Sequence, residues 1–191
     1  MKQNRTVRLI GRCGALALAT ILSCGAFAAC SKDKDPDPDA GKATGTIAPT
    51  EEVTTADPHQ KTFTSAGMTI TLSDDFQKST VPGYTVGFES DDAVLLALVE
   101  NDDALKGYTL DQYANKVISN NASLKGKTVK HDGGLTYFEF ESTADGVTYS
   151  YLAVVYQNGS DYWLFQFASQ KKDYNSMRAN FMKYAKTVRF N

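Results

Sequence analysis

An abrupt change in composition near Lys61 divides the chain into a part that cannot form a core and a part that can. Residues 31–60 contain no Phe, Tyr or Trp, and Ile47 and Val53 are their only branched aliphatic residues. Such a segment buries too little apolar surface to offset the entropy lost on ordering. From Lys61 onward, short apolar runs alternate with turn residues. We therefore expect a disordered, acidic Pro/Thr-rich tether over residues 30–60 and one globular domain over residues 61–191.

The N-terminus has the pattern of a secretory signal peptide. Residues 1–12 are polar and basic, and residues 13–29 form an uncharged run rich in Ala and Leu that ends in small side chains. A permanent membrane span needs about 20 apolar residues, and this run is shorter and diluted by Gly, Ser and Thr. Residues 1–29 are therefore predicted to be a signal peptide.

Two cleavage readings remain open at the end of this run. Ala26-Phe27-Ala28 fits ordinary signal peptidase, which would release a soluble protein. Phe27-Ala28-Ala29-Cys30 instead resembles the bacterial lipoprotein box, in which the cysteine receives diacylglycerol and becomes the new N-terminus. We favour lipid attachment at Cys30, because the charged residues that follow it are the solvated spacer that a lipidated N-terminus needs. Cys24 is the weaker candidate, since apolar residues follow it.

The spacer itself is acidic. Asp33, Asp35, Asp37 and Asp39 alternate along it, as oxygen ligands do in an EF-hand loop, but the Gly and Glu that such a loop requires further on are absent. A solvated spacer is the better interpretation. As a flexible chain it would span roughly 30 Å, enough to hold the domain clear of the lipid headgroups.

Cysteine and charge distribution exclude several classes of protein. All three cysteines precede Ser31, so the predicted domain can hold neither a disulfide framework nor a thiolate metal site. Four of the 20 basic residues precede Cys30, whereas all 22 acidic residues follow it, which leaves residues 31–191 with a net charge of −6. This balance disfavours binding to nucleic acid.

The domain reads as a series of strands with two helices. The first helix is expected from Thr109, where Thr109 and Gln112 form a capping box, and the second from Tyr174 to Lys186 with Asp173 as its N-cap. The predicted strands are Met68–Leu72, Tyr84–Glu89, Ala93–Val99, Thr128–His131, Leu135–Ser142, Val147–Tyr156, Asp161–Ala168 and Thr187–Phe190, the last returning to the sheet.

Two dipeptides predict hairpins, Asp145-Gly146 and Asn158-Gly159. If Asn158-Gly159 is the loop, Val154 faces Trp163, and both faces of the sheet are apolar and must be covered. Hairpins in place of repeated βαβ units predict an α/β protein of the α+β type, with a mostly antiparallel sheet covered by helices on both faces.

Several stretches resemble a known family. They are Met68–Leu72 followed by Phe76, Tyr108–Tyr113, Tyr137–Phe140, Tyr162–Phe167 and Phe181–Phe190, and together they are similar to the PsbP-like α/β/α sandwich domain found in small bacterial lipoproteins. The resemblance covers roughly residues 61–191 and rests mostly on core positions. It implies a fold, and no binding residue follows from it. The plant member is an extrinsic subunit of photosystem II, and nothing in this sequence connects the chain to photosynthesis.

Few side chains offer catalytic chemistry. His59 lies in the tether, and His131 is interpreted as a surface residue at a strand end. Nucleophile-elbow, phosphate-loop, dinucleotide and zinc-protease motifs are absent. The acidic pairs Asp74-Asp75, Asp91-Asp92 and Asp102-Asp103 are interpreted as turn residues at strand ends. The aromatic residues between Tyr149 and Phe167 are interpreted as core in preference to a ligand groove.

The sequence thus predicts a non-enzymatic interaction or accessory module, a lipoprotein anchored by Cys30 to the outer face of a bacterial membrane, with secretion as the alternative location. Its expected partners are the lipid bilayer, through acylated Cys30, and an unidentified envelope protein. We expect a monomer without catalytic residues, cofactor or metal. The alternative function is a small-molecule-binding protein or a carboxylate-based hydrolase, which a pocket with convergent polar groups and shifted carboxyl pKa values would favour.

Overall fold

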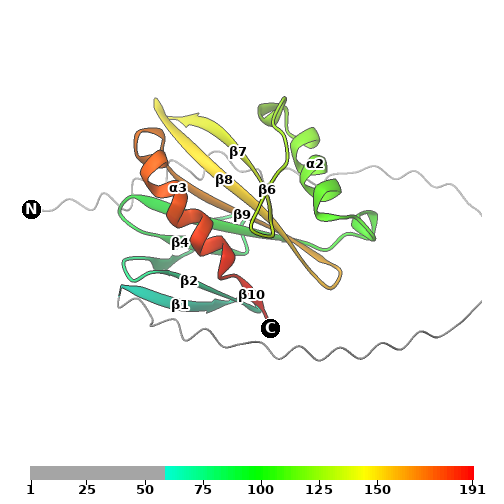
Figure 1. Ribbon diagram of the computed structural model, residues 1–191, viewed down its shortest axis with the longest axis horizontal. Coiled ribbons are helices and arrows are strands. Elements are labelled where there is room, and N and C mark those ends of the chain that lie inside the picture. Colours follow the sequence, from blue (N-terminus) through cyan, green and yellow to red (C-terminus); the bar gives the residue numbers. More distant parts are fainter. Residues whose placement is uncertain (1–58) are drawn as a thin grey trace, which may run out of the picture.

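The computed structural model describes residues 59–191, which form two antiparallel sheets and two α-helices (Figure 1). The strands are β1 Gln60–Ser65, β2 Met68–Ser73, β3 Gln77–Ser79, β4 Val86–Glu89, β5 Ala93–Glu100, β6 Lys130–Asp132, β7 Leu135–Ala144, β8 Val147–Asn158, β9 Asp161–Gln170 and β10 Arg189–Phe190. The α-helices are α2 Leu110–Asn120 and α3 Lys171–Lys186, and the short 3-10 helices are η2 Asp103–Leu105 and η3 Ala122–Leu124.

The larger sheet has seven strands in the order β3-β4-β5-β9-β8-β7-β6, and the smaller has three in the order β1-β2-β10. Every pairing is antiparallel. Consecutive strands joined by short turns account for most of these pairings. The exceptions are the β5–β9 pair at the centre of the large sheet and the β10–β2 pair, which brings the C-terminus back to the second strand.

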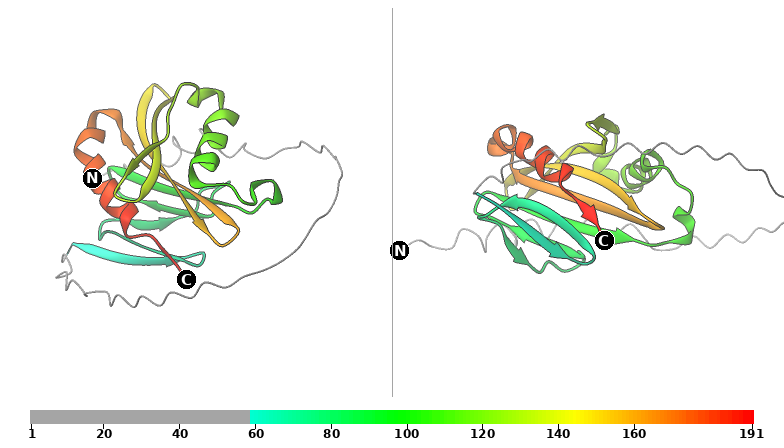
Figure 2. Two further views of the ribbon diagram at one scale, coloured as in Figure 1. Left: turned by 45° about the vertical axis from the view of Figure 1, so that its right-hand side comes forward. Right: turned by 60° about the horizontal axis from the view of Figure 1, so that its bottom comes forward.

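Each face of the large sheet carries its own hydrophobic core, because side chains alternate between the faces along every strand. On one face, α3 and the small sheet pack over Phe88, Leu95, Phe165 and Phe167. On the other face, α2 packs over Phe138, Val155 and Leu164. In the left view of Figure 2, α3 and α2 lie to the two sides of strands β8 and β9. The predicted α+β fold with both faces covered is confirmed, and the small sheet shares the covering of one face with α3.

Helix α2 begins where the sequence predicts. The Thr109 hydroxyl accepts from the Gln112 backbone N–H at 3.2 Å, and the Gln112 side chain accepts from the Thr109 backbone N–H at 2.8 Å. This reciprocal pair satisfies two donors that a helix otherwise leaves open. The buried stripe of Tyr113, Ala114, Val117 and Ile118 turns toward the sheet.

The β8–β9 register differs from the prediction by two residues. Asn158 pairs with Asp161, so the loop is Gly159-Ser160 and Val154 faces Phe165 instead of Trp163. Gly159 has φ +61° and is the loop residue that adopts the left-handed region, whereas Asn158 continues the strand. A shift by an even number of residues keeps each side chain on its predicted face.

The C-terminal part also differs in detail from the prediction. Helix α3 begins at Lys171, directly after β9, with Gln170 at its N-cap position and no side-chain cap, so Asp173 lies within the first turn. The negative charge of Asp173 still suits the positive end of the helix dipole. The final strand, β10, pairs with β2 in the small sheet and not with the large one. Strands β1 and β3 were absent from the prediction, because exposed polar residues dominate both.

Candidate functional site

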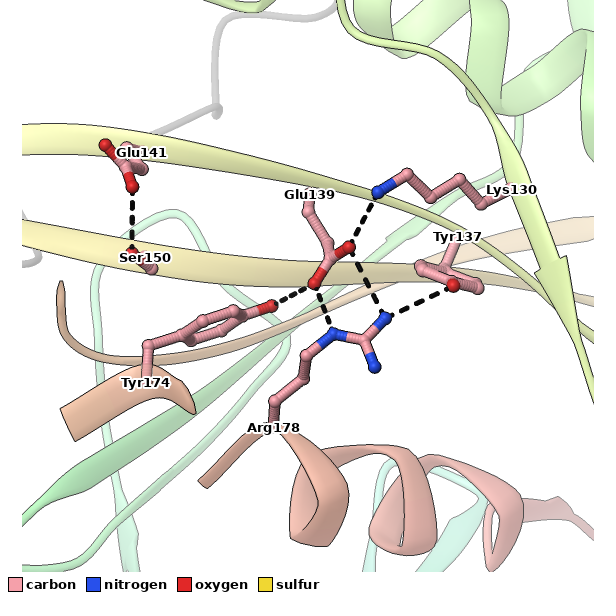
Figure 3. A network of polar contacts seen from close by, with 7 residues as sticks. All are labelled: Lys130, Tyr137, Glu139, Glu141, Ser150, Tyr174 and Arg178. Carbon is pink, nitrogen blue, oxygen red and sulfur yellow. Dashed lines mark hydrogen bonds and ion pairs between the residues drawn. The ribbon is translucent and has the colours of Figure 1, made fainter. Parts of the chain in front are cut away.

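The most developed polar cluster in the described domain surrounds Glu139 on β7 (Figure 3). Alternation along β7 places Tyr137, Glu139 and Glu141 on the face that α3 covers. Tyr174 and Arg178 are four residues apart on α3 and therefore share one side of that helix. Both donate to Glu139: the Tyr174 hydroxyl and the Arg178 Nε each lie 2.7 Å from Oε1.

The second carboxylate oxygen of Glu139 is occupied as well. Lys130 Nζ on β6 lies 2.8 Å from Oε2, and an Arg178 terminal nitrogen lies 3.4 Å from it. Arg178 also donates to the Tyr137 hydroxyl at 3.3 Å, with its guanidinium 5.9 Å from the centre of that ring. One carboxylate thus joins β6, β7 and α3.

These contacts determine the protonation states of the cluster. Burial alone would raise the pKa of Glu139, but hydrogen bonds from Arg178, Lys130 and Tyr174 and the charge of Arg178 outweigh it and lower the pKa to about 2. The hydrogen bond to Glu139 raises the pKa of Arg178. Burial, followed by the bond to Glu139, raises the pKa of Tyr174. Glu139 is therefore an ionised carboxylate whose acceptor positions are filled, which suits it to fixing α3 on the sheet and not to proton transfer.

Glu141 lies one step further along the same face. Its carboxylate accepts from Lys171 Nζ at 2.8 Å and from the Ser150 hydroxyl at 3.5 Å. The Glu141 side chain is 46% exposed and that of Glu139 is 19% exposed, so the second ion pair is the more solvated of the two.

His131 lies on β6 at the surface, where the prediction placed it. Its Nε2 is 3.3 Å from an Asp111 carboxylate oxygen on α2, and its Nδ1 is 3.4 Å from the Thr136 hydroxyl. This order resembles an acid–histidine–hydroxyl relay, but Thr136 is buried and the hydroxyl contact is long. The arrangement joins the first turn of α2 to the β6–β7 hairpin.

Glu100 is the most buried carboxyl group among the described residues. It ends β5, opposite Tyr162 on β9, and is 6% exposed. Burial raises its pKa, while the Tyr113 hydroxyl and the Lys116 charge lower it and Asp102 raises it. The Tyr113 hydroxyl interacts electrostatically with Glu100, but within residues 59–191 no acceptor has hydrogen-bonding geometry to it. A carboxyl enclosed in this way is not accessible to a dissolved substrate.

The predicted acidic pairs all lie in turns or at helix starts, as expected. Asp74 and Asp75 follow β2, Asp91 and Asp92 join β4 to β5, and Asp102 caps η2 by accepting from the Ala104 N–H at 2.9 Å. Asp74 lies 3.7 Å from His59. No group of three potential metal ligands occurs among the described residues.

The described surface includes two open hollows. One of about 280 Å³ lies beside the β3–β4 pair and is lined by Ser65, Lys78, Ser79, Thr80, Thr85, Val86 and Gly87. The other, of about 680 Å³, follows α2 and is lined by Tyr108, Gln112, Asn115, Lys116, Ile118 and Ser119. Neither contains Glu89 or Glu100, the two carboxyl groups whose pKa burial raises.

Sequence reasoning missed the Glu139 cluster. Its members lie far apart in the sequence, at Lys130, Glu139, Tyr174 and Arg178, so no local motif joins them. The only local signal is the alternation of Glu139 and Glu141 with apolar residues on β7, which places two charges on a covered face of the sheet. Cys30 and the tether lie outside the described residues. None of the helices in residues 59–191 is long and apolar enough to cross a membrane.

Two coverings on opposite faces of an antiparallel sheet define the domain as an α+β sandwich. No protein-family model and no curated protein matches the chain in sequence. Among solved structures, the solution structure of cyanobacterial PsbP from Synechocystis matches at 15% identity with a TM-score of 0.50, over 76% of this chain and 99% of that chain. The domain therefore has the PsbP-like fold.

Two further structures are similar. A crystal structure from Bacteroides thetaiotaomicron matches at 14% identity with a TM-score of 0.53, over 70% of this chain and 49% of that one, so this chain spans about half of its length. LpqN, a Mycobacterium tuberculosis protein involved in cell envelope biogenesis, matches at 13% identity with a TM-score of 0.39, over 70% of this chain and 86% of that chain.

Proposed function

We propose that the protein is a bacterial lipoprotein held by acylated Cys30 on the extracytoplasmic face of a membrane, and that its domain is a non-enzymatic interaction or accessory module. The observation that carries the proposal is the junction at Cys30, where a short apolar run with small residues at its end meets a charged spacer. Two acyl chains hold a protein stably on a bilayer, so diacylglycerol at Cys30 would anchor the domain without further membrane contact.

The two carboxyl groups with the strongest structural constraints, Glu139 and Glu100, support a non-enzymatic role because neither is free to react with a dissolved substrate. Glu139 is saturated by three neighbouring side chains, and Glu100 is enclosed beneath α2. The alternative, a small-molecule-binding protein or hydrolase, requires shifted carboxyl groups that line a pocket, and the two hollows described above hold neither Glu89 nor Glu100. We therefore favour the module.

The anchor is tested by Cys30→Ser in the full-length protein produced in a bacterial host. Wild type is expected in the detergent-rich phase of a detergent partition and Cys30→Ser in the aqueous phase, with Cys24→Ser as the matched control that stays with wild type. A wild-type protein that partitions into the aqueous phase with Ala29 as its mature N-terminus would establish cleavage after Ala26-Phe27-Ala28 and secretion.

The module is tested separately by chemical cross-linking in intact cell envelopes, followed by affinity purification of the anchored protein and mass spectrometry. A reproducible protein cross-link that competes with added soluble domain supports an interaction module. Turnover of envelope substrates by the purified protein that is lost in Glu100→Gln would instead support the hydrolase.

A further inference from the structure

Strand β7 leaves part of its outer edge without a partner strand. It runs from Leu135 to Ala144, but β6 pairs only with Leu135, Thr136 and Tyr137. Strand β8 follows β7 on the inner side as far as Ala144. Figure 1 shows β7 at the border of the large sheet, with β6 beside one end only. Among the described residues, no strand pairs with the outer edge of β7 from Phe138 to Ala144.

The turns at both ends of β7 determine which backbone groups face this edge. Asp145-Gly146, with φ +50° and +76°, is a two-residue loop, so Ala144 and Val147 form a hydrogen-bonded pair. Even-numbered residues of β7 therefore bond to β8. At the other end, the Gly133-Gly134 loop makes Asp132 and Leu135 a hydrogen-bonded pair, so odd-numbered residues bond outward. The N–H and C=O groups of Glu139, Glu141 and Thr143 consequently point to the open edge.

Charged side chains on an edge strand normally protect it from pairing, and Glu139 and Glu141 could be assigned that role. Both glutamates, however, are held over the α3 face by cations: Lys130 and Arg178 bind Glu139, and Lys171 binds Glu141. Their negative charge is neutralised on that face and is not directed along the edge. Residues 138–144 also contain no Pro and no Lys, the residues that most often block an edge.

We propose that the open edge of β7 pairs with the same edge of a second copy of this chain, antiparallel and about a two-fold axis that passes through Ser142. In this register Glu141 of one copy forms a hydrogen-bonded pair with Thr143 of the other, and Thr143 with Glu141. Four backbone hydrogen bonds result, two for each pair. The two seven-stranded sheets become one continuous sheet with an isologous interface.

Side chains fit this register on both faces. On the α2 face, the large Phe140 lies opposite the small Ala144, and Ser142 lies opposite its own copy. On the α3 face, Glu141 lies opposite uncharged Thr143, which is exposed and already bonds to the Thr148 hydroxyl at 3.0 Å. Within the paired residues 140–144 no like charges are directly opposed, and Glu139, which falls beside Asp145 of the loop, is already neutralised by Lys130 and Arg178.

A shift of the axis to Glu141 is disfavoured on two grounds. It would oppose the two Glu141 carboxylates directly, and it would place Asp145 beside Tyr137, a position that Lys130 of β6 already occupies. With the axis at Ser142, Asp145 falls beside Glu139, beyond the end of β6. The open edge thus accommodates the Ser142 register beyond the end of β6, and a second copy brings an edge of the same length.

The pairing involves few residues, so we expect it to be weak in dilute solution. The pairing rests on the proposed function in one respect only: anchoring on one membrane raises the effective concentration at which two copies meet. It departs from the monomer expected from the sequence. The pair and the anchor are separable, since the cross-link described next is formed between domains whether or not Cys30 carries lipid.

The test is cross-linking in the full chain through one cysteine added to the described domain, which has none of its own because the three natural cysteines all precede Ser31. Across the proposed axis, Ser142 and its copy form a non-hydrogen-bonded pair with Cα atoms about 4.5 Å apart, close enough for a disulfide. Ser142→Cys is expected to give a disulfide-linked dimer in oxidised cell envelopes. Ser160→Cys, an exposed position at the β8–β9 loop and hence at the opposite end of the sheet, is the matched control and should not exceed wild type.

A second pair of variants tests the backbone hydrogen bonds in the Ser142→Cys background. Thr143→Pro removes the outward N–H and should reduce the cross-linked dimer roughly tenfold, because both symmetry-related bonds are lost. Thr143→Ala removes the same side-chain hydroxyl but keeps the N–H, and should leave the yield within about twofold. Each variant is checked for retention of wild-type protease resistance.

The outcomes separate the possibilities. A Ser142→Cys yield no higher than that of Ser160→Cys, or equal effects of Thr143→Pro and Thr143→Ala, would overturn the pairing. Cross-linking of Ser142→Cys to a different envelope protein in place of its own copy would also overturn it and would identify a hetero-partner strand. Partition of the same samples between detergent and water reports the anchor independently.

Discussion

The Tyr174 hydroxyl donates to the Glu139 carboxylate at 2.7 Å and so joins the first part of α3 to the middle of β7. Arg178, one turn further along α3, donates to the same oxygen at 2.7 Å. Strand β9 runs directly into α3 without a side-chain cap, so the N-terminal half of the helix depends on these lateral contacts for its position. Removal of the carboxylate would leave a buried phenol and a guanidinium without their acceptor.

Glu139→Gln is therefore expected to lower the free energy of unfolding by about 1–3 kcal/mol at neutral pH, as for other partly buried, hydrogen-bonded charges. Urea denaturation followed by circular dichroism measures the change. Glu141→Gln is the matched control on the same strand and face. Because Glu141 is 46% exposed, its pair with Lys171 is screened by solvent, and the loss should stay below about 1 kcal/mol. Equal losses in both variants would contradict a special role for Glu139.

The contribution of Glu139 should also appear in the pH dependence of the free energy of unfolding. The pKa of Glu139 is about 2 in the folded protein and near the ordinary 4.5 when unfolded, so the unfolded state binds the proton first. The stabilisation is present above pH 4.5 and is lost as the pH falls toward 2. Denaturation series at pH 7, 5 and 3 should show a steeper acid loss for wild type than for Glu139→Gln. Parallel curves would mean that the ion pairs contribute no net stability.

Glu100 should behave in the opposite way. Burial raises its folded pKa above 4.5, so its contribution is most favourable below that pH and is lost as the pH rises through the folded value. Glu100→Gln is then expected to increase the free energy of unfolding at pH 7 and to have little effect at pH 4. Glu89, whose pKa burial also raises, provides the comparison on β4, next to the edge strand β3. A Glu100→Gln variant less stable than wild type at pH 7 would show that Lys116 and Tyr113 compensate the buried charge.

Sequence patterns correctly predicted those helix starts and turns that depend on residues close together in the chain. The Thr109–Gln112 capping box and the Asp145-Gly146 turn each involve residues within three positions, and both occur as expected. Strand β1 could not be predicted in the same way, because only Phe63 of its six residues is buried and the strand exists through pairing with β2. The β8–β9 register was missed by two residues because both alternatives bury the same side chains.

Long-range relationships lay beyond sequence reasoning for a different reason. Glu139 meets Tyr174 and Arg178 because the β9–α3 junction and the strand order bring α3 over β7, and neither is visible in a residue spacing. The open edge of β7 likewise follows from the shortness of β6, a three-residue strand that was predicted to begin two residues earlier.

The domain should fold without the tether. Residues 61–191 contain no cysteine and enclose two cores on the faces of one sheet. A protein limited to these residues is expected to unfold in a single cooperative thermal transition whose midpoint is unchanged by reductant or chelator. A transition broader than that of the full-length protein, or a midpoint that falls on addition of chelator, would contradict this prediction.

Trp163 provides the most direct probe of the α3-side core. It is 4% exposed on β9, opposite Tyr156, with Phe165 and Phe190 at ring-centre distances of 5.9 and 5.5 Å. Its emission should be blue-shifted, and Trp163→Ala should lower the free energy of unfolding by about 3–5 kcal/mol through lost transfer energy and a cavity.

The indole N–H has no hydrogen-bond partner within the described residues. Trp163→Phe removes that buried donor while keeping an aromatic ring, so it should cost far less than Trp163→Ala. Equal losses for Trp163→Phe and Trp163→Ala, measured by urea denaturation, would contradict a cost that arises from lost ring packing. A solvent-like emission maximum would contradict the burial of the ring.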